Sequence, residues 1–354
     1  MCEREEASAL KEGRQNRYRR GRRRPSGIRI AMILLALAVV YAGILLSVRA
    51  VGNRLERQDA VEAVGSLEGR FDTNELTTQY ANRTWTYRKR DLTNILLLGV
   101  DWMETEDAVS GRYAGQADFL YLITLDKKNR AIMTLQLDRD TITDIRIFGP
   151  FGDYTGIRTT QLCLSYAYGD TPAQNSENTV WAVERLLGGI PVDACVALDM
   201  GAIDALNDAL GGVTVTLEED FSHLDAQMTK GATLTLKGGQ AELFVRGRMS
   251  VGDGKNASRM RRQRAFLQAA TEKIVQGLND DVEYADRIFD ALSAHMTADV
   301  ERSWLVNRAY ESRAYRRLET MTLAGSNSVG DDGFMEFHVD ADSLGELLAA
   351  NYFE

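Results

Sequence analysis

Apolar and polar positions alternate regularly from residue 91 to the end of the chain. Short apolar runs at 94–100, 118–125 and 130–137 have the length of strands, and the run at 94–100 is apolar enough to predict burial on both faces. The polar turn at 126–129 joins the second run to the third and predicts a hairpin. Because a hairpin reverses the chain, the second and third strands are expected to be antiparallel, and we take the three strands to run up, down and up.

Beyond residue 170, helix-like and strand-like stretches alternate. A first helix is expected to begin at Ser176 or Asn178 and to stop at Gly188, a long helix is expected from Ser258, and the tail beyond 280 is predicted to be mostly helical. The other predicted elements are strands at 192–198 and 213–217, helices at 200–212 and 237–245, and a last strand at 334–339. This order predicts an α/β domain over residues 91–354, a three-layer α/β/α sandwich with a mixed central sheet.

An uncharged apolar segment lies near the N-terminus at residues 30–48, directly after the arginine-rich stretch 14–25. Its length at about 1.5 Å per residue is enough to cross a hydrocarbon core about 30 Å thick. We therefore predict a basic cytoplasmic tail at 1–27, one transmembrane helix at 28–48 and a helical stalk at 49–90, with the folded domain outside the cytoplasm. A cleaved signal peptide is the alternative, but its apolar region is normally about 7–15 residues, which favours an uncleaved anchor.

The charge of the chain is divided unevenly between this N-terminal part and the rest. The formal net charge is -9, yet residues 1–29 hold ten basic and four acidic residues, a net +6, so the remainder carries -15. An acidic folded domain argues against nucleic acid as a partner. Cys163 and Cys195 match no zinc or redox spacing; two free, buried thiols are favoured over a bridge between them.

Acidic side chains lie at three strand ends that the predicted topology brings to one edge of the sheet. Asp101 ends the first strand, Asp118 begins the second, and Asp138, Arg139 and Asp140 follow the third. Aspartate is common in turns, so any one of them alone favours a structural role. Three positions at one edge, where open α/β sheets place their ligands, favour a binding site instead.

The segment 244–266 concentrates positive charge in this otherwise acidic chain. If the backbone after residue 244 is extended, Arg246 and Arg248 point to the same side. In the following helix Arg259, Arg262 and Gln263 are spaced to share a face.

Cations near a helix N-terminus are unfavourable unless an anion is close, and guanidinium groups suit phosphate oxygens. These arginines therefore predict a phosphate site, with Mg²⁺ held by the nearby carboxylates and substrate phosphates. The alternative is an exposed, solvated helix face, which is the interpretation given to Arg261 and Arg264.

The ordered motifs resemble the LytR-CpsA-Psr family of bacterial cell-envelope phosphotransferases over residues 91–277. They are "NILLLGVD" (94–101), "ADFLYLITLD" (117–126), "LDRDT" (137–141), "LSYAYGD" (164–170), "GIPVDACVALDMGAIDALNDALGGVTV" (189–215), "LKGGQAELFVRGR" (236–248) and "SRMRRQRAFL" (258–267). A basic tail followed by one membrane span also fits the family.

The resemblance implies a membrane-anchored enzyme that takes a glycopolymer from a polyprenyl pyrophosphate carrier and joins it to peptidoglycan through a phosphodiester, with Mg²⁺ at the pyrophosphate. Asp101 and Asp118 would hold the metal, and Asp140 would orient the arginines or accept the proton of the attacking hydroxyl. The implied pyrophosphate ligands are Arg139, Arg246, Arg248, Arg259, Arg262 and Gln263. An apolar cavity under the sheet would hold the prenyl chain, with Val180, Val183, Leu187 and Ile203 as candidate lining residues.

Some positions depart from the family pattern. Met103 and Gln116 stand where the family often has arginine, and Gln161 and Cys163 stand where it has lysine and asparagine. Losing these contacts leaves two alternatives open: hydrolysis of the same lipid pyrophosphate by water, or non-catalytic binding of prenyl phosphate or anionic wall polymer.

Overall fold

The computed structural model describes residues 71–72, 76–80, 83–102, 115–149, 152–247 and 251–354. The predicted cytoplasmic tail and transmembrane helix lie outside these residues, as do the first part of the predicted stalk, Met103 and Arg248. Within the described part of the chain, no helix is both long and apolar enough to cross a membrane.

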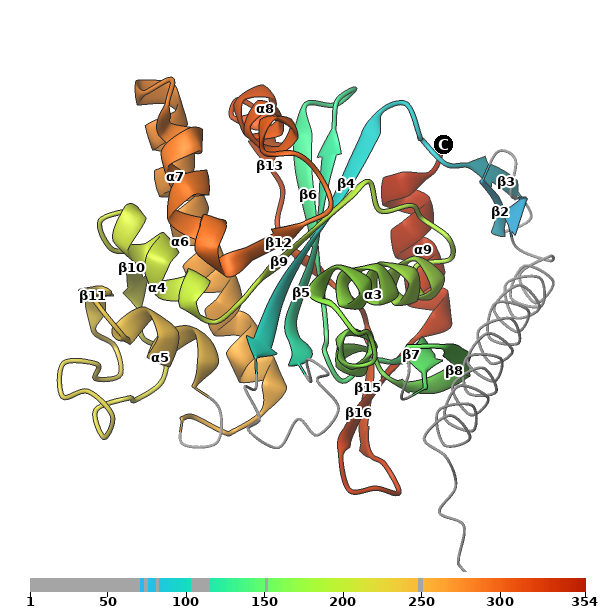
Figure 1. The fold of residues 1–354 in the computed structure, drawn as a ribbon, viewed down its shortest axis with the longest axis horizontal. Helices are drawn as coiled ribbons and strands as arrows, with labels where there is room; N and C mark the ends of the chain where they lie inside the picture. The colour runs from blue at the N-terminus through green and yellow to red at the C-terminus, as the bar shows by residue number, and fades with distance from the viewer. Residues whose placement is uncertain (1–70, 73–75, 81–82, 103–114, 150–151, 248–250) are drawn as a thin grey trace, which may run out of the picture. The chain divides into compact units, whose positions relative to one another are not determined.

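A mixed seven-stranded sheet forms the centre of the fold (Figure 1). Its strands follow the order β12 (Met296–Ala298), β9 (Ala194–Leu198), β4 (Leu92–Trp102), β5 (Gly115–Asp126), β6 (Ala131–Leu137) and β13 (Arg316–Arg317), with β14 (Met321–Thr322) also pairing with β6. β4, β5 and β6 are successively antiparallel, which confirms the predicted up, down and up course. β9 runs parallel to β4, so the sheet is mixed, as predicted.

Helices cover both faces of the sheet, and Figure 1 shows α3 and α9 on one side and α6, α7 and α8 on the other. The helices are α3 (Pro172–Leu186), α4 (Gly201–Ala209), α5 (Gln240–Arg246), α6 (Asn256–Asp280), α7 (Tyr284–Leu292), α8 (Arg302–Ser312) and α9 (Ala341–Tyr352). Two 3-10 turns, η1 (Leu162–Ala167) and η2 (Ser293–His295), join them to the strands. The predicted three-layer α/β/α arrangement is observed.

Two-stranded hairpins complete the fold outside the central sheet. They are β7 (Ile142–Phe148) with β8 (Tyr154–Gln161), β10 (Thr214–Thr216) with β11 (Thr233–Thr235), and β15 (Gly325–Val329) with β16 (Met335–Val339). The tail beyond 280 therefore contains strands as well as helices. The first predicted helix begins earlier than expected, because Thr171 caps it by accepting a hydrogen bond from the Gln174 amide (3.2 Å) and Pro172 occupies its first turn.

The prediction of a helical stalk is wrong for its last part. Three short strands occupy it, namely β1 (Phe71–Asp72), β2 (Thr77–Tyr80) and β3 (Arg83–Thr86), which pair in that order. The sequences "TTQY" and "RTWT" are rich in threonine and aromatic residues, which fit a pleated strand better than a helix.

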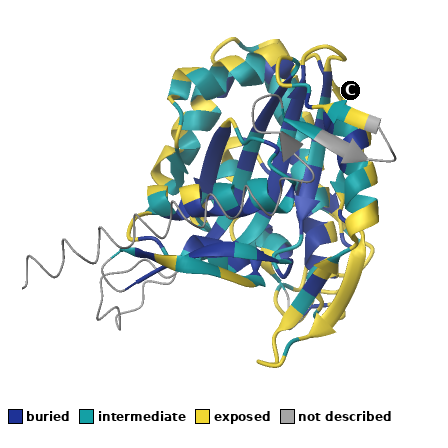
Figure 2. Ribbon diagram, turned by 90° about the vertical axis from the view of Figure 1, so that its right-hand side faces the viewer, coloured by how far each residue is buried: buried dark blue, intermediate teal, exposed yellow. Residues whose placement is uncertain are grey.

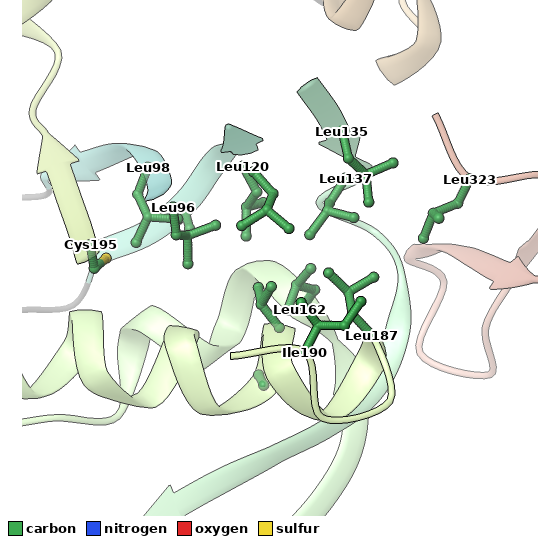
Figure 3. Packing of buried hydrophobic residues seen from close by; sticks show 14 of the residues in the cluster. Leu96, Leu98, Leu120, Leu135, Leu137, Leu162, Leu187, Ile190, Cys195 and Leu323 are labelled. Carbon is green, nitrogen blue, oxygen red and sulfur yellow. The ribbon is translucent and has the colours of Figure 1, made fainter. Parts of the chain in front are cut away.

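The main core lies between the sheet and α3 (Figure 3). Leu96, Leu98 and Val100 of β4 are fully buried there, whereas Ile95 and Leu97, which alternate with them, are only half-buried. The prediction that this strand is buried on both faces is thus wrong for the second face. In Figure 2 the strands of the central sheet are largely buried, whereas the helices that cover it are partly exposed. The incompletely filled face is the one turned toward α4 and α6, where the site lies.

Candidate functional site

Polar side chains from three neighbouring strands meet at one edge of the sheet. Asp101 lies near the end of β4 opposite Gln116 of β5, and Asp118 lies two positions farther along β5. A β-bulge shifts the register at this point, because Gly99 pairs with Phe119 while the next residue of β4 pairs with Ala117. The bulge leaves Asp118 on the same side as Phe119, so its carboxylate faces α6 instead of the core.

The predicted Asp-Arg-Asp segment directly follows β6 and reaches into this edge. Arg139 forms an ion pair with Asp118 through Nη1 and donates from Nη2 to Oε1 of Gln116 (2.7 Å). Its Nε lies 3.2 Å from Oδ1 of Asp140, which is 7% exposed. Asp140 therefore orients Arg139, one of the two roles implied by the resemblance.

Arginines from two helices approach the same carboxylates. Arg259, at the start of α6, donates from Nη1 to Oδ2 of Asp118 (3.0 Å), and Arg246 lies with Nη2 3.3 Å from Oδ1 of Asp101. Arg246 also pairs with Glu242, four residues earlier. Arg246 is the last residue of α5, so the predicted extended backbone is wrong at this position. Three of the predicted arginines thus converge on Asp101 and Asp118.

Arg262 does not take part in this cluster. On a helix its direction differs by about 100° from that of Gln263, so it faces α5 while Arg259 and Gln263 line the cavity described below. Its Nε donates to the carbonyl of Phe244 (2.9 Å), and its Nη2 donates to the carbonyl of Gly247.

Its third donor group, Nη1, pairs with Glu219, and the guanidinium carbon lies 5.5 Å from the centre of the Phe221 ring. All three nitrogens of Arg262 are bonded within the protein. Because its partners are Glu219 and two backbone carbonyls, and not Asp101 or Asp118, the prediction that Arg262 contacts pyrophosphate is contradicted. Arg262 instead fastens α6 to the end of α5.

An apolar cavity of about 100 Å³ opens beside the arginines, between the sheet and helices α4 and α6. Its walls include Leu97, Phe119, Leu206, Phe266 and Leu267, and its rim carries Asp118, Arg246, Arg259 and Gln263.

Of the four candidate lipid-pocket residues, Ile203 lines this cavity. Leu187, which is labelled in Figure 3, and Val183 are fully buried in the core on the α3 side, and Val180 packs against the same core. These three were assigned to the wrong face, because helical spacing shows which residues share a side but not which face of the sheet that side covers.

Asn256 belongs to the site although the sequence did not single it out for this role. Its Nδ2 donates to Oδ1 of Asp138 (2.7 Å), and its Oδ1 accepts from Nη2 of Arg259 (2.8 Å). Burial raises the pKa of Asp138. Asn256 therefore ties the strand end to the first turn of α6 and fixes Arg259. The available signal is its position two residues before the predicted helix that carries Arg259.

The unfavourable position of Arg259 near a helix N-terminus is offset inside the protein. The carboxylate of Asp118 lies 3.0 Å from its guanidinium, and Asp138 contacts Asn256 in the same turn. The inference that an external anion is needed for stability is therefore too strong. Arg261 is exposed, as predicted, whereas Arg264 is half-buried and donates to Oε1 of Gln136 (2.6 Å), so the prediction of a solvated side chain is wrong for Arg264.

The two cysteines for which the sequence predicts free, buried thiols can be compared with the structure. Cys163 and Cys195 are both free and buried, as favoured from the sequence. The backbone amide of Cys163 donates to the carbonyl of Arg139 (3.0 Å), and burial raises the pKa of its thiol to about 11. Cys163 therefore stays a neutral thiol beside the arginine cluster.

The donor set at the sheet edge suits Mg²⁺ only in combination with a substrate. Asp101 and Asp118 lie on the same side of neighbouring strands. In the described ranges no three His, Cys, Asp or Glu side chains are grouped to hold a metal ion. Because Mg²⁺ typically uses one or two carboxylates plus phosphate oxygens and water, two aspartates fit this pattern.

Comparison with known proteins agrees with this architecture. Residues 51–351 match the LytR_cpsA_psr family. This chain belongs to that family. One relative is the polyisoprenyl-teichoic acid–peptidoglycan teichoic acid transferase TagU of Halalkalibacterium halodurans, 29% identical over 241 residues, which are 68% of this chain and 71% of that protein. Biofilm regulatory protein A of Streptococcus mutans is 28% identical over 251 residues, but the match covers only 58% of its length and 68% of this chain.

The fold of this LytR_cpsA_psr protein is also found in solved structures. The crystal structure of protein gbs0355 from Streptococcus agalactiae superposes with a TM-score of 0.60. The match covers 73% of this chain and 86% of that one at 23% sequence identity, and it shows the shared fold.

Proposed function

We propose that this protein transfers a glycopolymer from a polyprenyl pyrophosphate carrier to a hydroxyl group of peptidoglycan, with formation of a phosphodiester. One observation carries the proposal: Arg246 and Arg259 line the mouth of an apolar cavity, and Arg139 pairs with Asp118 at the same mouth. Guanidinium groups suit phosphate oxygens, and an apolar wall suits a prenyl chain. The name of the TagU relative, a teichoic acid transferase, supports the same chemistry.

The residues present have distinct roles in this proposal. Arg246 and Arg259 exchange their carboxylate partners for phosphate oxygens, and Asp140 keeps Arg139 in position or accepts the proton of the attacking hydroxyl. The oxygen of that hydroxyl bonds to the phosphorus next to the sugar, and the bond from this phosphorus to the bridging oxygen breaks. Prenyl phosphate leaves. Mg²⁺ held by Asp101, Asp118 and phosphate oxygens would offset the charge that develops there.

The size of the cavity adds a structural condition. Its volume of about 100 Å³ corresponds to only about three water molecules, too little for a long prenyl chain. Only part of a long prenyl chain therefore fits inside it. The predicted span at 28–48 would hold the domain close to a membrane-embedded carrier, outside the cytoplasm.

The test supplies the full chain with a purified lipid-linked donor, with and without a peptidoglycan acceptor. Polymer joined to the acceptor and release of prenyl phosphate are expected. Release of free polymer phosphate at the same rate in both samples would identify a hydrolase. Donor that is bound but unchanged in both samples would identify a binding protein and contradict the proposal.

The dependence of the transfer rate on Mg²⁺ is expected to arise from the carboxylates of Asp101 and Asp118. Changing Asp101→Asn should raise the Mg²⁺ concentration needed for half-maximal transfer by about tenfold, because one charged oxygen ligand is lost. Transfer rates over a Mg²⁺ titration provide the measurement, and Asp220→Asn, an exposed aspartate outside the cluster, is the matched control. Unchanged activity of the parent protein in excess chelator would exclude the metal.

A further inference from the structure

A groove of about 690 Å³ lies beside the N-terminal part of α5, whereas Arg246 is the last residue of that helix. The proposed chemistry does not use this groove. The first turns of α5, the strand β11 and the loop after Phe221 form its walls. Its lining residues are Leu224, Asp225, Gln227, Leu234, Thr235, Lys237, Gly239, Gln240, Glu242 and Leu243. Its size is that of a site for a small molecule or for a few sugar rings.

The groove is directly connected to the arginine cluster. Glu242 lines the groove and forms an ion pair with Arg246, one helical turn farther along α5. Arg246 in turn lies 3.3 Å from Asp101. The end of the groove at Glu242 therefore lies about 6 Å along the helix axis from Arg246, an arginine of the proposed phosphate site.

Hydrogen bonds hold the polar groups of the groove in fixed positions. Gln240 donates from Nε2 to Oδ2 of Asp225 (2.8 Å), and the amide of Gln227 donates to Oδ1 of the same carboxylate (2.9 Å). These two bonds, that of Gln240 first, lower the pKa of Asp225. Oε1 of Gln240 accepts from the amide of Lys237 (3.1 Å). The result is a preorganised carboxylate–amide pair.

Such a pair suits the hydroxyl groups of a sugar, because a carboxylate accepts hydroxyl protons and an amide both donates and accepts. Leu224, Leu234 and Leu243 supply the apolar part of the lining, which suits the C–H faces of sugar rings. The lining holds two carboxylates, Asp225 and Glu242, and a single lysine, Lys237, so it offers no excess of positive charge to a chain of phosphates.

We propose that this groove binds uncharged sugar rings of one of the two reactants, the peptidoglycan acceptor or the first sugars of the donor. The proposal rests on the proposed transfer reaction and adds to it a saccharide subsite beside the phosphate site. The anionic part of the polymer lies elsewhere, on the arginine side.

Binding and kinetics together test the subsite. An N-acetylglucosamine tetramer is the uncharged probe, polyglycerol phosphate is the anionic probe, and calorimetry on the full chain measures both without donor. We expect the tetramer to bind and polyglycerol phosphate not to compete. Asp225→Asn and Gln240→Ala should each weaken tetramer binding by about tenfold, whereas Asp220→Asn, an exposed aspartate on the same loop that does not line the groove, should leave it unchanged.

The kinetic arm identifies the source of the sugar. A higher KM for acceptor with unchanged kcat and donor KM in Asp225→Asn assigns the groove to the acceptor, and a higher donor KM alone assigns it to the donor's sugars. No binding of the tetramer, or unchanged binding in both variants, overturns the subsite. Because calorimetry needs no turnover, this result is separate from the failure of donor cleavage that would overturn the transfer reaction itself.

Discussion

Replacement of Arg139 by alanine is expected to lower transfer from a prenyl pyrophosphate donor by about 100- to 1,000-fold, the usual effect of removing a group that stabilises developing charge. Arg139 contacts Asp118, Gln116 and Asp140 at once, so its guanidinium is aimed before substrate arrives. Arg139→Lys should retain a part of the activity, because it keeps the charge and loses the planar fork. Steady-state rates at saturating donor provide the measurement.

The matched control for Arg139 is Arg261→Ala. Arg261 lies in the same arginine-rich stretch as Arg259 and Arg262, but it is exposed and its ion pairs with Glu218 and Glu219 are long, at 3.8 and 3.7 Å. Its removal should change the rate by less than about twofold, since exposed pairs contribute little. An Arg139→Ala protein as active as the parent would contradict the proposed phosphate site.

Arg262→Ala is expected to lower the free energy of unfolding by about 3–5 kcal/mol, because it leaves the largely buried carboxylate of Glu219 without its main partner. The Arg262 side chain is 6% exposed and that of Glu219 13% exposed. The carbonyls of Phe244 and Gly247 also lose their donor, which adds to the loss. Thermal unfolding of the full chain measures the change.

A double variant separates structure from substrate binding at this position. Arg262→Met together with Glu219→Leu removes both charges and should recover part of the stability that Arg262→Ala loses, since an apolar pair often replaces a buried ion pair at little cost. Parent-like unfolding of Arg262→Ala combined with a large loss of donor affinity would instead support the ligand role predicted from the sequence.

The carboxylates at the strand ends and the arginine-bearing face of α6 show which parts of the site could be predicted from the sequence. The hairpin at 126–129 is a local feature, and it places Asp118 and Arg139 at one edge, whereas Asp101 joins them through the antiparallel pairing of β4 with β5. The bulge that turns Asp118 toward α6 has no local signature, because it depends on how β4 and β5 match their registers over the whole length of the strands. Arg259 and Gln263 followed from helical spacing, but the orientation of Arg262 depended on α5.

The sequence by itself determined the family, the order of strands and helices from residue 91, and the convergence of acidic strand ends with arginines, because periodicity, turns and motif order are encoded in neighbouring residues. Tertiary structure decided which side chains face a ligand. It buried Val183 and Leu187 in the core on one face of the sheet and left Ile203 beside a cavity on the other. The physical reason is that the pattern of apolar and charged residues shows which side chains will be buried or will form ion pairs. The residues against which they pack or with which they pair lie in segments far apart in the chain, and only the folded structure brings these together.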